Sequence, residues 1–479
     1  MKIVVVGGGI AGLAAAHRLA GAHGAPGDSS SPHPLITLLE ADGRLGGKIR
    51  TEDFAGRPLD VGAEALLARV PAALELCREL GLEHDLVAPA TDQAYVWTDR
   101  LRPLPPRLLA GVPDGSQALI GSGILSPAGI ARAGLDLIVP ARRPKGDVSI
   151  GSLVRRRLGR QVLERLIDPL LGGIHAGSCD ELSAPAAAPQ LVAALRSRRS
   201  LVRGLRELSR GSPPTPAGPT FLTLSGGLQE LARTLAERMT AVECRTGVTL
   251  ESLEGLPGGG SRLRLAGGET LDADYVILAV PAFAAAAILA EACPAAAAEL
   301  AGIPYASVAT IALSYPLEAL GDRPAGSGFL AARRPGRTIT ACTWSSAKWP
   351  QLAGDTMLLK CSAGHAGNRS ALDLDDEQLI EAVRWDLVQA MNLKAAPLQA
   401  RVFRFERALP QYTVGHLERV AGIEAELARL PAVSVCGAAY RGVGVAACVS
   451  DGQAAAERAL AALGEAHRRV QRSAAPLGA

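Results

Sequence analysis

The first residues with a chemical pattern are glycines spaced for binding phosphate. The stretch Lys2–Val6 is apolar and typical of a buried strand, and Gly7, Gly9 and Gly12 follow it at the head of an alanine-rich segment. In such a strand–turn–helix unit, the first glycine makes the tight turn, the second lets the backbone approach a pyrophosphate, and the third lets the helix pack closely on the strand. The start of the helix also offers N–H groups and a positive dipole end to an anion. The residues predicted to contact a dinucleotide here are Gly7, Gly8, Gly9, Ile10, Ala11 and Gly12.

An acidic residue and a second pair of glycines follow the predicted second strand, residues 35–39. Glu40 lies farther from Gly12 than the usual spacing of about 20 residues, because a Gly/Ser/Pro-rich surface loop, 21–34, intervenes. We still expect Glu40 to bind the ribose hydroxyls. The glycine pair after it lets backbone N–H groups reach phosphate oxygens, and Arg44 adds a charge-assisted contact. The cofactor contacts predicted in this part are Glu40, Ala41, Arg44, Gly46, Gly47 and Lys48.

Length and composition indicate a globular protein. The chain has 479 residues, of which 48% are hydrophobic and 20% charged, which supports large buried cores. A net charge of +3 is too small to favour nucleic acid as a partner. The eight cysteines form no Cys-x-x-Cys pair, so we expect no metal site, no secreted disulfide framework and a reducing cytoplasm. The most apolar region, 275–301, is broken by Pro281 and Pro294, so no transmembrane segment is predicted.

Hydrophobic periodicity predicts how strands and helices follow one another. Strands are expected at 275–280 and 433–437, the second followed by an alanine-rich helix, and strand-like segments dominate between about 300 and 415. Helical spacing over 148–171 is expected to break at Asp168–Pro169. The basic segment 196–219 is predicted to be a mobile, solvated loop.

Several motifs together resemble the flavin amine oxidase superfamily and, within it, the oxygen-dependent protoporphyrinogen/coproporphyrinogen oxidases. Both glycine motifs and the segment 59–65 are similar to the elements that hold FAD in that family. The segment 436–448 resembles the closing motif of the porphyrinogen oxidases. His175 stands where that family commonly has Tyr, and Phe405 where it commonly has Trp. Further similar segments extend the resemblance over nearly the whole chain: 168–177, 222–231 and 409–416.

The resemblance implies a fold class, domain bounds and further cofactor contacts. The fold class is α/β, with a Rossmann-like FAD-binding domain of the amine oxidase/porphyrinogen oxidase type, a mixed α+β substrate domain and an inserted helical domain. The expected bounds are 1–65, 222–290 and 430–479 for the FAD-binding domain, 95–221 for the helical domain, and 66–94 and 291–429 for the substrate-binding domain. The further FAD contacts implied are Gly62, Ala63, Glu64, Ala65, Val248 (expected in a strand), Phe405, Gly437, Val445, Ala446 and Ala447.

For activity, the resemblance implies an FAD-dependent oxidase that removes six hydrogens from a porphyrinogen, two at a time, and passes the electrons to O2 with release of hydrogen peroxide. Because the flavin carries the redox chemistry, no side chain is expected to be catalytic. The predicted lack of a membrane anchor favours coproporphyrinogen III, with protoporphyrinogen IX as the alternative. The predicted substrate contacts are Arg100, Arg102, Arg107 and His175, with Arg69 ranked behind them.

Two other classes of function remain open at this point. A flavin amine oxidase would share the fold and both glycine motifs, but such enzymes usually need an aromatic cage, and only 3% of this chain is aromatic. A non-catalytic binding protein of the Rab escort type would share the nucleotide-domain topology without using a flavin. Peripheral membrane contact and hand-over of the product to a ferrochelatase are also left open.

Overall fold

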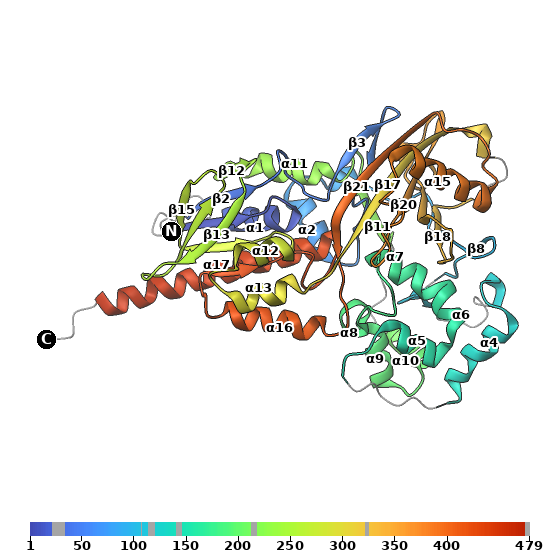
Figure 1. Cartoon of the computed structure of the whole chain (residues 1–479), viewed down its shortest axis with the longest axis horizontal. Helices are drawn as coiled ribbons and strands as arrows, with labels where there is room; N and C mark the ends of the chain where they lie inside the picture. The colour runs from blue at the N-terminus through green and yellow to red at the C-terminus, as the bar shows by residue number, and fades with distance from the viewer. Residues whose placement is uncertain are drawn as a thin grey trace.

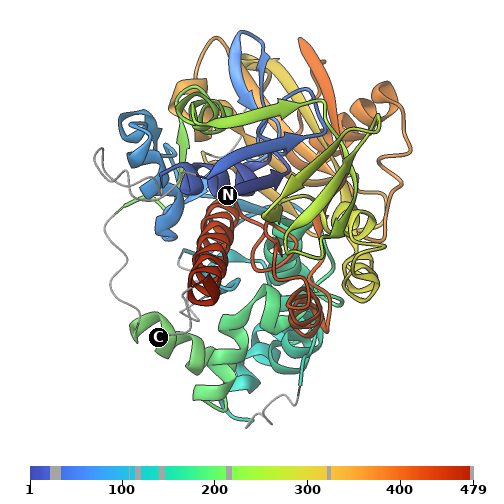
Figure 2. The same cartoon turned by 90° about the vertical axis from the view of Figure 1, so that its left-hand side faces the viewer.

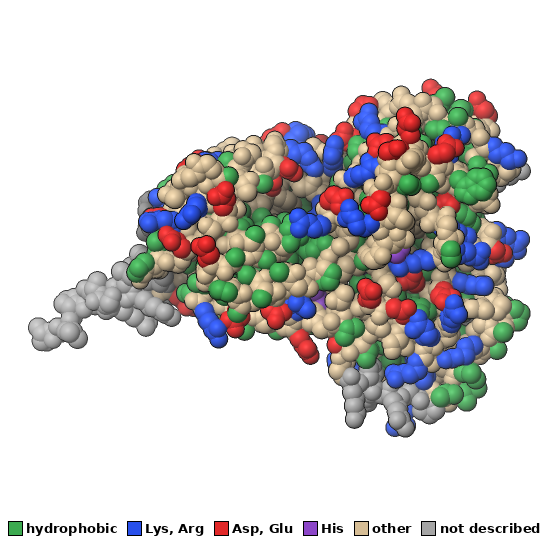
Figure 3. All heavy atoms as spheres, in the orientation of Figure 1, with side chains coloured by type: hydrophobic (Ala, Val, Ile, Leu, Met, Phe, Trp, Pro, Cys, Tyr) green, Lys and Arg blue, Asp and Glu red, His purple; other side chains and the backbone are tan. Residues whose placement is uncertain are grey.

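The computed structural model has three regions, which Figure 1 shows side by side. A parallel sheet with its helices lies at one end, a larger sheet lies at the other, and a group of helices lies below the larger sheet. Helix α17 (Val445–Ala474) starts inside the first region and projects outward from it, toward the viewer in Figure 2. Acidic and basic side chains are interspersed over the face shown in Figure 3. The structure describes residues 1–21, 34–106, 108–113, 120–139, 146–211, 218–320 and 325–474.

Five parallel strands form the sheet that contains the N-terminal strand, in the order β12-β2-β1-β16-β22. In β1, Ile3 and Val5 face one hydrophobic core while Val4 and Val6 face the opposite one, as the alternation of side chains along a strand requires. The order of strands reverses beside β1, and open α/β sheets bind ligands at such a point. The strands are β1 (Lys2–Val6), β2 (Leu35–Glu40), β12 (Val242–Thr246), β16 (Tyr275–Leu278) and β22 (Val433–Val435).

Helices cover both faces of this sheet. One face packs against α1 (Ile10–Gly21), α2 (Pro71–Glu79), α11 (Gln229–Arg238) and α17. The other face packs against an antiparallel layer and three helices: β13 (Leu250–Gly255), β14 (Ser261–Leu265), β15 (Thr270–Ala273), α12 (Ala282–Ile288), α13 (Pro294–Ala301) and α16 (His416–Leu427). Helices α1 and α17 approach so closely that a Cβ at Gly452 would lie 2.1 Å from the Ala11 carbonyl oxygen. This contact fixes the first part of α17 against the start of α1.

The larger sheet has seven strands in the order β21-β17-β20-β19-β18-β7-β8. Helix α15 (Asp376–Met391) covers one face. The hairpin β3 (Thr51–Phe54) and β4 (Arg57–Asp60) packs on the other face. Strands β7 and β8 fall in the range 95–221 expected for the helical domain yet pair within this sheet, and the domain bounds stay a prediction. The strands are β7 (Tyr95–Trp97), β8 (Leu101–Pro103), β17 (Tyr305–Pro316), β18 (Gly328–Ala331), β19 (Ile339–Trp344), β20 (Thr356–Ala363) and β21 (Gln399–Pro410).

The third region is helical and corrects two sequence predictions. The expected break at Asp168–Pro169 is wrong, because residues Leu163–Gly172 continue as π-helical turns (η3), a geometry in which helices absorb irregular positions. The helix is interrupted instead at Gly159, where φ is +90°. The main elements are α4 (Pro127–Gly134), η2 (Leu135–Leu137), α5 (Ile150–Leu158), α6 (Arg160–Val162), α7 (Gly173–His175), α8 (Ala184–Ala187), α9 (Pro189–Ser197) and α10 (Leu201–Gly211).

The predicted loop over 196–219 is also wrong, since α10 occupies its middle. Leu201 and Leu205 are buried, so the basic segment has one apolar face at helical spacing. Helix α10 crosses α9 closely, because a Cβ at Gly204 would lie 2.1 Å from the Ala194 carbonyl oxygen. Packing on α9 therefore stabilises a helix that the high charge of the segment obscured.

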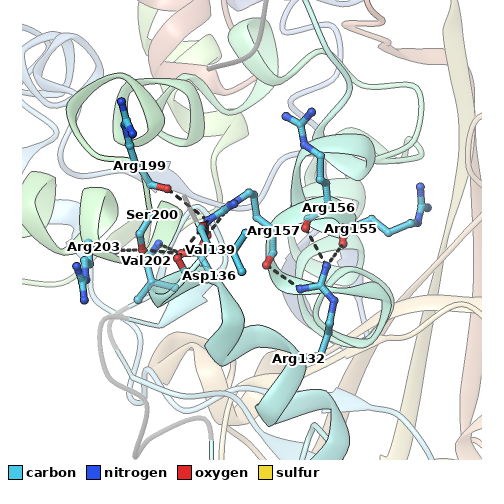
Figure 4. Close-up of polar contacts among 10 residues, drawn as sticks. All are labelled: Arg132, Asp136, Val139, Arg155, Arg156, Arg157, Arg199, Ser200, Val202 and Arg203. Atoms are coloured by element: carbon cyan, nitrogen blue, oxygen red, sulfur yellow. Dashed lines mark hydrogen bonds and ion pairs between the residues drawn. The ribbon is translucent and has the colours of Figure 1, made fainter. Parts of the chain in front are cut away.

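A buried ion pair joins the helices of this region (Figure 4). The Arg157 Nε donates to Asp136 Oδ1 at 2.6 Å, and both side chains are buried. The second carboxylate oxygen of Asp136 accepts from the Ser200 hydroxyl at 2.7 Å and from the Val202 N–H at 2.9 Å. Arg132 donates to carbonyl oxygens in the last turn of α5. The network fixes η2, α5 and the start of α10 relative to one another.

Candidate functional site

The fold brings the two glycine motifs into direct contact. The Gly46 N–H donates to the Gly8 carbonyl oxygen at 2.8 Å, and Gly46 forms a parallel bridge with Gly9. A Cβ added at Gly47, where φ is +56°, would lie 3.1 Å from the Gly9 Cα, so a side chain there would strain the backbone and crowd Gly9. Residues predicted separately from two stretches of sequence thus line one place at the end of β1.

The glycines of the first motif fall into two kinds. A Cβ at Gly7 would lie 2.6 Å from the Ala279 carbonyl oxygen, and one at Gly12 would lie 1.9 Å from the Gly7 carbonyl oxygen. A Cβ at Gly9 would meet no heavy atom of the described chain within 4 Å. Gly7 and Gly12 are therefore required by protein packing, while Gly9 leaves open space beside the first turn of α1. That space fits a phosphate group at a helix N-terminus.

Glu40 lies at the carboxyl end of β2, next to this space. Its Oε2 accepts from the Gly8 N–H at 2.6 Å, and its Oε1 accepts from the Asp42 N–H at 2.8 Å. Each carboxylate oxygen can accept a further hydrogen bond, so the predicted role toward ribose is compatible with these contacts. Val248 donates its N–H to the Glu40 carbonyl oxygen at 2.9 Å, but it lies between β12 and β13 and not in a strand as expected.

Arg44 and Lys48 differ in how they are held. The Arg44 guanidinium donates to the carbonyl oxygens of Gly47 at 2.5 Å and Ile49 at 3.2 Å, so it braces its own loop. The Lys48 side chain is accessible to solvent, yet surrounding protein desolvates it and lowers the pKa of its ammonium group. The Ala63 N–H donates to the Lys48 carbonyl oxygen at 3.3 Å, which places the 62–65 segment beside the second glycine motif.

The side chain of Glu64 belongs to a cluster that the sequence did not reveal, which we call the acid–lysine cluster: Asp60, Glu64, Lys348 and Lys360. Glu64 forms ion pairs with both lysines, and the Lys360 Nζ also donates to the Asp60 carbonyl oxygen at 3.0 Å. Burial alone would raise the pKa of the Glu64 carboxyl, but the two ammonium groups outweigh it and lower the pKa to about 2. No local motif could have signalled lysines almost 300 residues away.

Asp60 is the second carboxyl of the cluster. Burial raises its pKa to about 6, although a hydrogen bond from the Thr51 hydroxyl, the charge of Lys360 and a hydrogen bond from the Leu228 N–H act in the opposite direction. The Leu228 N–H lies at the start of α11, where a carboxylate is stabilised by the helix end. Asp60 therefore ties the β3–β4 hairpin to α11 beside the 62–65 segment.

The C-terminal motif converges on the same place as the N-terminal one. A Cβ at Gly437, where φ is +120°, would lie 3.7 Å from the Ala11 Cβ. The Gly437 N–H donates to Asp451 Oδ2 at 2.8 Å, which joins the turn to the second helical turn of α17. Residues 445–447 open α17, so the start of this long helix lies near the start of α1. Phe405 is half-buried and packs in the same small core as Ala65, so these two predicted FAD contacts belong to one cluster.

His175 is buried and connected to the C-terminal motif through Tyr412. The two ring centroids are 5.6 Å apart, and Tyr412 stacks on His416 at 4.0 Å. The Tyr412 hydroxyl donates to the Ala438 carbonyl oxygen and accepts from the Gly442 N–H, both at 2.7 Å. Burial lowers the pKa of His175 to about 4, so its ring is neutral near pH 7. Its Nδ1 has no hydrogen-bond partner among the described residues.

The predicted arginines are not gathered at the cofactor motifs. Arg102 pairs with Asp99 at 3.1 Å beside the turn between β7 and β8, while Arg100 and Arg69 are exposed. Arg107 lies outside the described residues. The ion pair between Arg102 and Asp99 involves no predicted cofactor residue, so the role of these arginines stays a prediction.

Comparison with known proteins decides the family. A family model described as flavin containing amine oxidoreductase matches residues 10–460. A coproporphyrinogen III oxidase from Bacillus subtilis is 38% identical over 466 residues, which cover 96% of this chain and 97% of the relative. The chain belongs to the flavin-containing amine oxidoreductase family. Its members bind a flavin, so the open space and the converging glycine motifs of this flavin oxidoreductase have a cofactor that fits them.

Further relatives agree with this family assignment. A coproporphyrinogen III oxidase from Mycobacterium leprae is 38% identical over 464 residues, covering 96% of this chain and 97% of the relative. A crystal structure from Exiguobacterium sp. 255-15, provisionally named protoporphyrinogen oxidase, superposes with a TM-score of 0.84 at 33% identity and covers 97% of this chain and 99% of that chain. The predicted fold class and the resemblance to porphyrinogen oxidases are confirmed. No helix in the described part of the chain has the length and apolarity needed to cross a membrane.

Proposed function

We propose that this flavoprotein is an FAD-dependent oxidase that converts coproporphyrinogen III into coproporphyrin III, with O2 as the electron acceptor and hydrogen peroxide as the second product. The observation that carries the proposal is similarity over 96% of the chain to relatives named coproporphyrinogen III oxidase. The aromatic cage expected of an amine oxidase finds little support in a chain with 3% aromatic residues. Complete flavin-side motifs speak against a binding protein that uses no flavin.

The flavin is proposed to be FAD because the site offers an adenosine side as well as a phosphate side. Glu40 and Val248 would hold ribose and adenine, and the open space at Gly9 would hold the pyrophosphate. The segment 62–65 and the start of α17 would hold the flavin ring. Bound FAD would accept two electrons and a proton from the substrate carbon and pass the electrons to O2.

The protein residues would hold the flavin and orient the substrate beside it. The N-terminal end of α17 would stabilise negative charge, because a helix start carries free N–H groups and a positive dipole end. The acid–lysine cluster would keep the 62–65 segment in one position through the ion pairs of Glu64. Neutral His175, held against Tyr412, leaves its Nδ1 free for a polar atom of the substrate.

The proposal includes a location and a destination for the product. All eight cysteines are free, which supports a reducing compartment such as the cytoplasm. Hand-over of the product to a ferrochelatase is a further part of the proposal. Protoporphyrinogen IX is the competing substrate, since the similar Exiguobacterium structure is provisionally named a protoporphyrinogen oxidase.

An aerobic assay tests the proposal. Purified protein is expected to carry a yellow cofactor that is released as FAD on acid denaturation. With coproporphyrinogen III, porphyrin fluorescence should rise and three molecules of hydrogen peroxide should form per porphyrin, because six hydrogens leave in pairs. No porphyrin formation above the spontaneous rate, with peroxide produced from amines, would refute it.

A further inference from the structure

A recess of about 240 Å3 lies where three segments of the chain meet. One wall is formed by η3 and α7, a second by the turn between β18 and β19, and a third by the segment that follows β20. Its lining includes Arg333, Arg334 and Arg337, and Asp168 is the one acidic side chain among the described lining residues. With three arginines and one carboxylate among the described lining residues, the recess has an excess of positive charge.

Two of these arginines are fixed by the protein itself. Arg333 pairs with Asp168, whose Oδ2 lies 3.0 Å from the Arg333 Nε. Arg337 donates to the carbonyl oxygens of Ala332 at 2.7 Å and Trp97 at 2.8 Å, and its guanidinium carbon lies 3.7 Å from the centroid of the Trp97 ring. Burial, together with the charge of Arg334, lowers the pKa of Arg337 to about 10. Carbonyl groups and a ring face hold this cation, which forms no ion pair with another described residue, although the charges of Asp386 and Asp99 act on it from farther away.

Among the three arginines of the recess, Arg334 is the one whose guanidinium is not held by other described residues. Its carbonyl oxygen accepts from the Arg337 N–H at 3.2 Å, but its exposed guanidinium forms no hydrogen bond or ion pair with the residues that the structure describes. Polar residues also line the recess, among them His365, Asn368 and Ser370 from the segment after β20. Burial lowers the pKa of His365, so this ring is neutral near pH 7 and accepts or donates without adding charge. The planar fork of an unpaired arginine matches a carboxylate in a bidentate way.

The recess is connected by direct contacts to the proposed flavin site. The Ala366 N–H donates to the Ala176 carbonyl oxygen at 2.7 Å, so the third wall rests on the end of α7. The preceding residue, His175, accepts on its carbonyl oxygen a hydrogen bond from the Gln411 side chain at 2.7 Å. Gln411 precedes Tyr412, whose hydroxyl contacts the C-terminal glycine motif. The recess therefore lies along the chain of contacts that leads to the cofactor residues.

We propose that this arginine recess binds carboxylate groups on the rim of the substrate, with Arg334 as the principal contact. The inference rests on the proposed function, because a porphyrinogen is an apolar disc whose only charged groups are the carboxylates at its rim. The volume suits a carboxylate-bearing arm and is too small for the whole macrocycle. Coproporphyrinogen III carries four such groups and protoporphyrinogen IX two, so the recess favours the more highly charged substrate.

Binding and turnover of the flavin-loaded protein test the inference with one variant and two controls. Arg334→Gln removes the charge, Arg334→Lys keeps it, and Arg264→Gln removes an exposed arginine from β14, which lies against the parallel sheet. Affinity is measured by fluorescence titration with coproporphyrin III and with its tetramethyl ester, which lacks the carboxylates. KM and kcat are measured with coproporphyrinogen III.

For Arg334→Gln, we expect weaker binding of coproporphyrin III and a higher KM, each by about threefold to tenfold, since the group is exposed. Binding of the ester and kcat should stay unchanged, Arg334→Lys should recover most of the loss, and Arg264→Gln should behave as wild type. Equal losses for the acid and the ester, or no loss, would overturn the inference even if the enzyme oxidises porphyrinogens. If the wild type oxidises none, the proposed function fails, and the binding comparison still decides the recess because it needs no turnover.

Discussion

Replacing Gly9 with alanine should separate cofactor binding from folding. A Cβ at Gly9 meets no described heavy atom within 4 Å, so the protein without flavin has room for the methyl group. The matched variant is Gly12→Ala, whose Cβ would lie 1.9 Å from the Gly7 carbonyl oxygen. Both changes add one methyl group to the same glycine motif. At Gly12 the methyl group meets protein backbone, whereas at Gly9 it enters the space proposed for the cofactor.

The structure sets the size of each effect. In the flavin-free protein, Gly9→Ala should leave the free energy of unfolding unchanged or raise it by about 0.4 to 1 kcal/mol, through lower entropy of the unfolded chain. Forcing a methyl group against the bound pyrophosphate should cost about 1 to 3 kcal/mol. That cost corresponds to a flavin Kd about 5-fold to 150-fold higher. Gly12→Ala should lower the free energy of unfolding by about 1 to 3 kcal/mol with or without flavin, because protein backbone must move.

The two variants can be compared with the wild type in two measurements. Urea denaturation of the flavin-free proteins gives the free energy of unfolding, and quenching of flavin fluorescence on titration gives Kd. If Gly9→Ala binds FAD as tightly as the wild type, the cofactor does not occupy the open space at Gly9. If Gly9→Ala is as unstable as Gly12→Ala, the distinction between the two kinds of glycine is wrong.

Three other variants and one control test the buried charges by urea denaturation, the first two of them over a range of pH. Glu64→Gln leaves the lysines of the acid–lysine cluster unpaired and should lower the free energy of unfolding by about 3 to 5 kcal/mol near pH 7. The difference from wild type should shrink as pH falls from the ordinary carboxyl pKa of 4.5 toward the folded value of about 2, because the wild-type carboxylate then becomes protonated. A difference that does not depend on pH would contradict this. Asp60 has a pKa raised from 3.8 to about 6, so the folded wild type binds this proton more tightly than the unfolded chain and loses stability as pH rises through that window. Asp60→Asn should abolish this decrease in the free energy of unfolding, which is about 2 to 3 kcal/mol in the wild type. Parallel pH profiles for the two proteins would count against the assignment to Asp60. Asp136→Ala leaves the buried Arg157 without its ion-pair partner and should lower the free energy of unfolding by about 3 to 5 kcal/mol. The control Asp180→Ala removes an exposed ion pair and should lower it by less than about 1 kcal/mol. Equal decreases would show that burial of the first pair is unimportant.

The glycine motif predicted to bind the pyrophosphate could be recognised from a local sequence pattern. Gly7, Gly9 and Gly12 each act within one strand–turn–helix unit, so their spacing alone carries the geometry. The contact between Gly9 and Gly46 could be anticipated only from the family resemblance, because the two residues lie far apart in the sequence. The predicted strand 35–39 is confirmed with one residue more, since β2 ends at Glu40 itself.

Tertiary contacts explain what the sequence did not predict. The segment around α10 was expected to be a loop because its arginines dominate its composition, whereas burial of Leu201 and Leu205 against α9 decides its structure. The partners of Glu64 come from strand β20 and from helix α14 (Ser345–Lys348), and no periodicity connects them to residue 64. In the same way, the Arg334 recess exists only because a turn of the larger sheet meets the end of α7.

The central claim is that this flavoprotein oxidises a porphyrinogen through its bound cofactor, and rapid mixing without oxygen tests it most directly. Flavin-loaded protein is mixed with coproporphyrinogen III, with protoporphyrinogen IX and with a panel of amines while the flavin absorbance is followed. We predict that coproporphyrinogen III bleaches the flavin at least as fast as protoporphyrinogen IX, that amines leave it unchanged, and that O2 restores the colour. A flavin that stays oxidised with both porphyrinogens would contradict the proposed function.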